Sequence, residues 1–135
     1  MTQINLGSRR VFICGSALRG QPDHQNLQAA QFIRETKTSP FYRFHAVADG
    51  WHPALYAVAE GGVSILGEVY ELTAKQYDYL ISTEPPNMYP GDIALEDEET
   101  VTAILYPHDL VKHHNWPDIS HYGGWAAYKK ALVSS

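Results

Sequence analysis

The sequence has one cysteine, Cys14, among its 135 residues. A single cysteine cannot form a disulfide within the chain, and low cysteine content is typical of proteins from reducing compartments, so we expect a cytoplasmic protein. Basic residues are also scarce, with 10 Lys and Arg against 15 Asp and Glu and a net charge of −5. Nucleic-acid binding needs a clustered basic surface, so this charge balance argues against a nucleic-acid partner.

Long hydrophobic runs are missing as well. No apolar segment approaches the ~18 residues that span a membrane, and the opening segment MTQINLGSRR lacks the apolar stretch of a signal peptide. We therefore expect neither a membrane span nor a secretion signal. No repeat, low-complexity tract or linker-like segment interrupts the sequence, which predicts one domain over residues 1–135. Hydrophobic residues make up 44% of the chain, enough for an ordinary core.

The pattern of apolar and turn residues predicts about six strands and two or three short helices. The strongest helix pattern covers residues 23–39, where Asp23 can cap the first turn and apolar residues recur at helical spacing. A second helix is expected over residues 73–83, capped by Thr73, and a third in the C-terminal tail. This content indicates an α+β protein built on a small mixed β-barrel, with a curved or closed sheet. Strands are expected within residues 9–15, 41–49, 53–61, 63–73, 91–97 and 99–107.

The first predicted strand runs directly into a glycine-bracketed segment, CGSALRG, at residues 14–20. After a strand, a turn such as Gly15–Leu18 can point several backbone N–H groups at one spot, where they would bind a carboxylate, a phosphate or a developing oxyanion. The alternative is a glycine turn that only reverses the chain. No lysine follows the turn, which excludes a phosphate loop of the Lys-Ser/Thr type.

Two carboxylates are candidates for acid–base chemistry. Glu84 follows the second predicted helix and precedes Pro85 and Pro86, which restrict its backbone and stiffen the segment. A rigidly presented carboxylate can act as a general base; the alternative is a solvated surface glutamate. Glu68 alternates with apolar residues of its strand and should face the packed side, where a carboxylate must be paired or protonated. Glu68 is therefore a second candidate for the acid or base. The alternative is a structural ion pair between Glu68 and Arg43.

Other side chains suggest less specific roles. Cys14 would need a neighbouring base to act as a nucleophile, and without one it is expected to fill space in the core. Arg19 and Arg43 are suited to bidentate contact with a substrate carboxylate, or serve as surface residues. The four histidines of residues 108–121 lack the ligand spacing of a zinc site, so we expect a solvated loop there and no metal.

Three aromatic residues, Tyr122, Trp125 and Tyr128, recur at helical spacing in the tail. Their simplest interpretation is a terminal helix packed over the end of the sheet. The alternatives are a lid over a pocket or the contact surface of a homodimer. Loss of the fold on removal of the chain from Asp118 onward would indicate packing, whereas a folded but inactive product would indicate a lid.

Several segments of the sequence resemble motifs of the γ-glutamylcyclotransferase-like family, and they occur in the same order as in that family. The family includes the AIG2-like plant proteins. VFICGSALRG is similar to the family's opening Tyr-Gly-Ser/Thr-Leu turn, and residues 41–73 are similar to its central block. LISTEPPNMY is similar to the segment that carries the catalytic Glu, with a Tyr a few residues later. The tail DISHYGGWAAY resembles the C-terminal domain of allophanate hydrolase, a relative with the same fold. The chain departs from the family pattern at Cys14, Ile81 and Pro85, where Tyr, Asp and Gly are usual.

The resemblance implies a γ-glutamylcyclotransferase-like fold and an enzyme that needs no cofactor. Its small-molecule substrate would be a γ-glutamyl amide or amine, whose own α-amine attacks the γ-carbonyl and releases 5-oxoproline. Glu84 matches the catalytic carboxylate. One alternative is a small carbamate or amide that loses CO₂, as associated with the allophanate hydrolase domain, which lacks that Glu; another is a non-catalytic module that binds a small molecule. The residues expected to contact substrate are Cys14, Gly15, Ser16, Ala17, Leu18, Arg19, Arg43 and Tyr89.

Overall fold

The computed structural model describes residues 8–27 and 30–134. Within these residues the chain forms seven strands, three α-helices and two short 3-10 helices. The strands are β1 (Arg9–Ile13), β2 (Gln31–Lys37), β3 (Tyr42–Val47), β4 (His52–Ala57), β5 (Leu66–Leu72), β6 (Tyr89–Ala94) and β7 (Thr100–Leu105). The helices are η1 (His24–Leu27), α1 (Ala74–Ser82), α2 (His108–His114), η2 (Ser120–Tyr122) and α3 (Trp125–Ser134).

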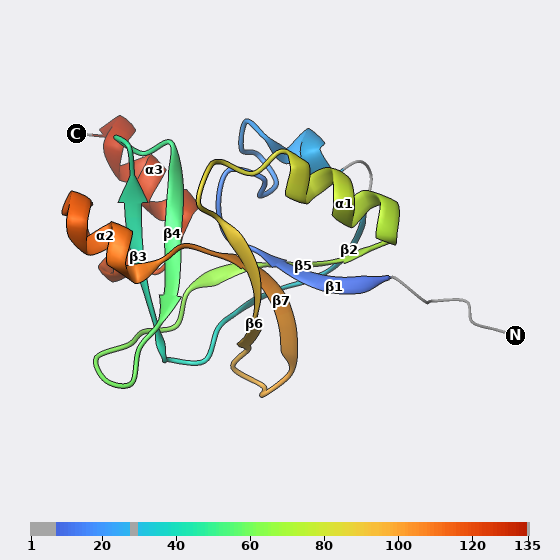
Figure 1. Ribbon diagram of the computed structural model, residues 1–135, viewed down its shortest axis with the longest axis horizontal. Helices are drawn as coiled ribbons and strands as arrows, with labels where there is room; N and C mark the ends of the chain where they lie inside the picture. The colour runs from blue at the N-terminus through green and yellow to red at the C-terminus, as the bar shows by residue number, and fades with distance from the viewer. Residues whose placement is uncertain (1–7, 28–29, 135) are drawn as a thin grey trace, which may run out of the picture.

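Five strands form one mixed sheet in the order β2-β5-β1-β7-β6, and β3 and β4 form a separate antiparallel pair. The central strand β1 runs antiparallel to β5 and parallel to β7. Figure 1 shows α1 and the η1 segment together above the five-stranded sheet. The β3–β4 pair lies to the left of that sheet in this view, beside α2 and α3. The α+β class expected from the sequence is confirmed, as are the predicted strands and the short helix after β5.

The expected β-barrel does not close in the described part of the chain. The edge strands β2 and β6 do not pair along their lengths; beyond their ends they meet at an isolated bridge between Thr38 and Leu95. The Ser39 N–H donates to the Ala94 carbonyl at 3.0 Å beside that bridge. Pairing stops there because Pro40 has no N–H to donate and the chain turns away toward β3. The result is a curved sheet whose two edges touch at one corner.

The prediction of a helix over residues 23–39 is wrong. Only His24–Leu27 is helical, as a 3-10 turn, and Gln31–Lys37 forms β2, antiparallel to β5. The expectation also fell on Gln28 and Ala29, which lie outside the described residues. The segment that becomes β2 carries aromatic and β-branched residues, and β5 offers it a ladder of main-chain partners. Tertiary pairing therefore overrides the helical spacing of the apolar residues.

The histidine-rich segment, expected as a loop, contains α2. Pro107 precedes this helix, and Asn115 ends it in the left-handed conformation at φ 55°. His108 stacks on the ring of Tyr56 with centroids 4.1 Å apart. These histidines pack against aromatic rings or lie exposed, and among residues 8–27 and 30–134 no group of three or more His, Cys, Asp or Glu is placed to hold a metal ion.

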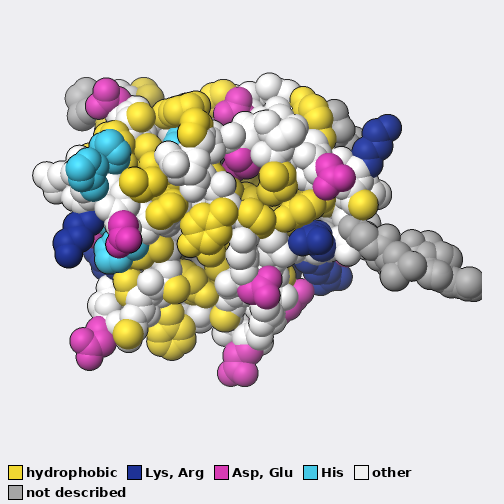
Figure 2. Space-filling view, viewed as in Figure 1, with side chains coloured by type: hydrophobic (Ala, Val, Ile, Leu, Met, Phe, Trp, Pro, Cys, Tyr) yellow, Lys and Arg dark blue, Asp and Glu magenta, His cyan; other side chains and the backbone are white. Residues whose placement is uncertain are grey.

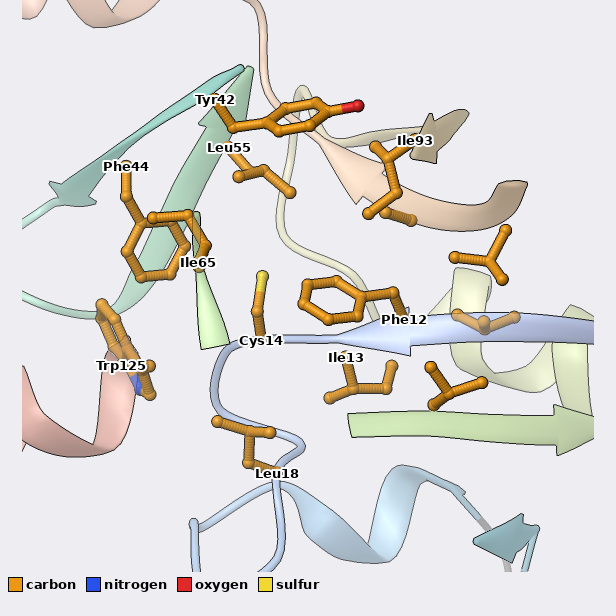
Figure 3. Packing of buried hydrophobic residues seen from close by; sticks show 14 of the residues in the cluster. Phe12, Ile13, Cys14, Leu18, Tyr42, Phe44, Leu55, Ile65, Ile93 and Trp125 are labelled. Carbon is orange, nitrogen blue, oxygen red and sulfur yellow. The ribbon is translucent and has the colours of Figure 1, made fainter. Parts of the chain in front are cut away.

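The core lies between the sheet, the β3–β4 pair and α3 (Figure 3). Trp125 is 1% exposed and meets Phe44 edge-on, with ring centroids 6.3 Å apart. Tyr128 is also buried, whereas Tyr122 is 36% exposed. The packing interpretation of the tail is therefore confirmed for Trp125 and Tyr128.

Candidate functional site

Helix α1 fixes the position of Glu84. Thr73 and Gln76 form a reciprocal capping box at its start, with the Gln76 N–H donating to Thr73 Oγ1 at 3.1 Å. Leu80 anchors the helix in the core at 1% exposure. The helix ends at Ser82, and the Glu84 N–H donates to the Ile81 carbonyl at 3.2 Å. A well-defined helix end therefore presents the Glu84 carboxyl group.

The turn after β1 provides the second component of the site. The Leu18 N–H donates to the Gly15 carbonyl at 3.1 Å, and the Asp23 N–H donates to the Ser16 carbonyl at 2.9 Å. A Cβ on residue 15 would lie 2.7 Å from the Pro53 ring, so glycine is required for close packing against β4. No described group accepts a hydrogen bond from the N–H groups of Gly15, Ser16 and Ala17. Three adjacent main-chain donors are thus available to a ligand.

Glu84 and the turn share a cavity of about 50 Å³. Of the predicted site residues, this cavity brings together Cys14, Gly15, Ser16, Ala17 and Glu84. A water molecule needs roughly 10–15 Å³ of such space, so the cavity holds on the order of four water-sized groups. The remaining lining residues are Phe12, Ile13, His52, Pro53, Leu80, Pro85, Met88 and Ile104.

The electrostatics of this cavity favour a protonated or proton-sharing Glu84. Burial, together with the Asp23 carboxylate, raises the pKa of Glu84 to about 7. No described group donates a hydrogen bond to the Glu84 carboxyl group. No described group therefore compensates its charge, and a carboxyl group in this state exchanges protons near neutral pH.

Cys14 lies beside this carboxylate but is not activated. Burial, and secondarily the charge of Glu84, raises the pKa of the Cys14 thiol to about 12. Figure 3 shows the sulfur of Cys14 pointing to the side of the strand where Leu55 and Ile65 pack. A thiol with this pKa is protonated at neutral pH and is a poor nucleophile. The prediction that Cys14 fills space in the core is confirmed.

His52 is a cavity residue that the sequence analysis missed. It is 3% exposed, at the start of β4, and its Nδ1 lies 3.1 Å from the Pro53 carbonyl oxygen. Burial lowers the pKa of His52, which keeps the ring neutral, and Nδ1–H then donates to Pro53. The local sequence around His52 does not predict this position. The imidazole lies at the turn because Pro53 packs against Gly15.

Glu68 is buried, as expected, but its partner is not Arg43. The Arg19 guanidinium donates to the Glu68 carboxylate at 2.9 Å, the Arg19 N–H donates at 3.2 Å, and the Tyr70 hydroxyl donates at 2.8 Å. Leu18, Arg19 and Glu68 do not line the Glu84 cavity but line a second cavity on the other side of the turn. The geometry of Glu68 is that of a structural ion pair.

Arg43 and Tyr89 also lie away from the cavity. Arg43 donates to Asp118 at 2.6 Å and to the Gly61 carbonyl at 2.9 Å. Although partial burial opposes the shift, hydrogen bonds from Arg43 and Ser120 lower the pKa of Asp118 to about 2. Tyr89 is 44% exposed on β6. Contact of either residue with substrate stays a prediction from the sequence.

The raised pKa of Glu84 predicts a pH-dependent gain in stability on substitution. Between pH 4.5 and about 7 the folded chain holds a proton that the unfolded chain releases, so wild-type stability falls as the pH rises through this window. Glu84→Gln removes this penalty. The variant should unfold with a free energy higher by up to roughly 3 kcal/mol above pH 7, and with little gain below pH 4.5. Urea denaturation at both ends of this window measures the difference.

The matched control for this measurement is Glu60→Gln, because Glu60 is exposed. Its effect on the free energy of unfolding should be small at every pH. An equal gain for Glu84→Gln at low and high pH would show that the carboxyl group is not buried as described.

No helix in the described part of the chain has the length and apolar character to cross a membrane.

Comparison with known proteins places this chain in a family. The family model of the allophanate hydrolase C-terminal domain matches residues 9–130. Urea amidolyase of Saccharomyces cerevisiae is 29% identical over 93% of the chain, and the chain spans 7% of that protein's length. A putative γ-glutamylcyclotransferase of Vibrio cholerae is 30% identical, with 78% of this chain and 93% of that protein covered.

Solved structures agree with this placement. The protein c4763 from uropathogenic E. coli superposes with a TM-score of 0.84 at 28% identity, covering 96% of this chain and 98% of that one. The allophanate hydrolase of Kluyveromyces lactis gives 0.85 at 27% identity, covering 93% of this chain and 21% of that one. The chain therefore belongs to the family of the allophanate hydrolase C-terminal domain, among the proteins of the γ-glutamylcyclotransferase-like fold.

Proposed function

We propose that the chain is an enzyme that releases 5-oxoproline from a γ-glutamyl amide or amine, with Glu84 as general base and acid. One observation carries this proposal: a carboxyl group with a pKa of about 7 shares a cavity with Gly15, Ser16 and Ala17, and among the described residues neither this carboxyl group nor their main-chain N–H groups have a hydrogen-bond partner. The similarity to the Vibrio cholerae protein supports the choice of substrate class.

In this reaction the substrate supplies its own nucleophile. The α-amine nitrogen bonds to the γ-carbonyl carbon, and the bond from that carbon to the leaving nitrogen breaks. The α-ammonium group first loses one proton to solvent through Glu84. As the free amine attacks, Glu84 takes a second proton from the attacking nitrogen and gives it to the leaving nitrogen, while the N–H groups of Gly15–Ala17 stabilise the oxyanion. A carboxyl pKa near 7 is close to that of an α-amino group, about 7.7–8.0, so the transfer is nearly balanced.

A second candidate is the release of CO₂ from a small carbamate or amide. The family match over residues 9–130 and the cavity volume of about 50 Å³ favour it. A carbamate group fits within such a volume, whereas a γ-glutamyl compound would leave its amine half outside. In this reaction Glu84 would supply the proton that replaces the lost carboxyl group.

One experiment distinguishes these candidates. The purified protein is incubated with a panel of γ-glutamyl amino acids and γ-glutamylamines and, separately, with small carbamates, and 5-oxoproline and CO₂ are measured, with Glu84→Gln as the control protein. We expect 5-oxoproline from at least one γ-glutamyl compound. CO₂ from a carbamate would select the second candidate, and tight ligand binding without any product would make the chain a binding module.

A further inference from the structure

A second, larger cavity lies on the other side of the Gly15–Leu18 turn. Its volume is about 410 Å³, within the range of about 300–1,000 Å³ that is usual for small-molecule sites. Leu18 and Arg19 line it, whereas Gly15–Ala17 line the Glu84 cavity, so the turn separates the two. Strands β2 and β5 contribute Glu35, Lys37 and Glu68, and the start of α3 contributes Gly124, Trp125 and Ala127.

One end of this cavity offers hydrogen-bond donors and positive charge. The first hydrogen bond of α3 runs from the Tyr128 N–H to the Gly124 carbonyl, and no described group accepts from the N–H groups of the three residues between them. Glycine at position 124 supplies no capping side chain, so this helix start keeps its donors and its partial positive charge. Lys37 pairs in register with Leu66, whose N–H donates to the Gly123 carbonyl at 2.7 Å. Lys37 lines the same cavity, beside the strand residue that bonds the segment preceding α3.

The indole of Trp125 adds an independent donor. The side chain is 1% exposed and lines this cavity, yet no described group accepts a hydrogen bond from its Nε1–H. Trp116 Nε1 is fully enclosed without a partner in the described part of the chain, whereas Trp125 Nε1 is not among the fully enclosed atoms. A buried indole N–H normally finds a partner. Here the cavity is the place from which an acceptor would come.

The other end carries net negative charge. Glu35 faces Glu68 across the β2–β5 pair, a like-charge arrangement that is destabilising unless a cation intervenes. Arg19 forms an ion pair with Glu68 and also interacts with the charge of Glu35, so one guanidinium serves both carboxylates and a net negative charge remains. Glu35 is exposed and has no hydrogen bond or ion pair among the described residues. A ligand cation placed here would compensate the remaining charge.

We propose that this cavity binds a small zwitterion, with its carboxylate at the α3 and Lys37 end and its ammonium group beside Glu35. The Cα atoms of Lys37 and Glu35 lie about 7 Å apart, two residues along one strand face. A ligand that reaches both side chains needs its charges several bonds apart, as in an ω-amino acid, rather than on neighbouring atoms as in glycine. A dianion is disfavoured, because its second negative charge would meet Glu35 and Glu68.

Calorimetric titration of the intact protein tests this proposal with glycine, γ-aminobutyrate and ε-aminocaproate as zwitterions, and with butyrate and butylamine as probes of one charge each. We expect γ-aminobutyrate or ε-aminocaproate to bind at least about tenfold more tightly than either singly charged probe, because two charge-assisted contacts form instead of one. Lys37→Gln and Glu35→Gln should each weaken that binding by about tenfold. Lys130→Gln and Glu60→Gln, which alter exposed charges outside the cavity, should leave it unchanged.

A further variant tests the helix start directly. Ala127→Glu places a carboxylate near the free N–H groups at an exposed position, where it should stabilise the helix and abolish zwitterion binding. Butyrate binding as tight as the zwitterions, no binding of any probe, or equal affinity of the Lys37→Gln and Lys130→Gln proteins would each overturn the proposal.

Discussion

Replacing Glu84 by glutamine is expected to lower the turnover of the proposed reaction by about 10²–10⁴-fold, with the fold intact. Glutamine keeps the shape of the side chain but cannot accept and return a proton. The carboxyl group has no hydrogen-bond partner among the described residues, so its removal breaks no structural contact. The kcat for 5-oxoproline release, measured at pH 8 on the best substrate of the panel, gives the result.

Two controls separate a chemical from a structural effect. Glu60→Gln changes an exposed carboxylate and should keep full turnover. Glu68→Gln changes a buried carboxylate outside the Glu84 cavity and should lower stability through the weakened contacts to Arg19 and Tyr70. Full turnover of the Glu84→Gln protein, or an equal loss of turnover in the Glu68→Gln protein, would remove Glu84 from its proposed role.

The same carboxyl group links activity to stability. Its pKa of about 7 means that the folded protein is destabilised wherever Glu84 is ionised, which is also where it can act as a base. A variant that is more stable above pH 7 and less active would carry both signatures of a functional carboxylate. A surface glutamate, the alternative left open by the sequence, predicts neither.

The parts of the fold that the sequence predicted are those governed by local interactions. Thr73 signalled the start of α1, and the structure has it in a capping box with Gln76. The turn at Gly15 and the carboxylate at Glu84 were each identified from backbone chemistry and motif. Their approach into one cavity agrees with the resemblance that paired them.

The parts that it missed depend on contacts between distant segments. Strand β2 exists because β5 offers it a partner, and no local pattern distinguished it from a helix. His52 reaches the cavity because its neighbour Pro53 packs against Gly15. Pro53 and Gly15 are 38 positions apart in the sequence. Arg19 rather than Arg43 pairs with Glu68 because the turn folds back over β5. Ion pairs of this kind follow from tertiary geometry, which spacing along the chain does not encode.

Figure 2 shows apolar side chains gathered over the middle of one face, among scattered charges of both signs. Figure 3 shows the buried core, in which Trp125 lies beside Phe44 and Ile65. The tail that carries Trp125 thus completes the core, so the stability of the whole chain depends on it.

Replacing Trp125 by alanine is therefore expected to destabilise the protein by about 3–5 kcal/mol. The indole is 1% exposed and contacts the rings of Phe44 and Tyr128, so alanine would leave a large cavity in the core. Domains of this size have a total stability of about 5–15 kcal/mol, so this loss would be a large fraction of it. Urea denaturation measures the change.

Val133→Ala is the matched control, because Val133 lies on the same helix and is 87% exposed. Its free energy of unfolding should stay within about 0.5 kcal/mol of the wild-type value. Removal of the chain from Asp118 onward should abolish the fold, since it takes away Ser120, which bonds the Phe44 main chain, together with Trp125. Unchanged stability of the Trp125→Ala protein would contradict the packing role of the tail, whether or not turnover is lost.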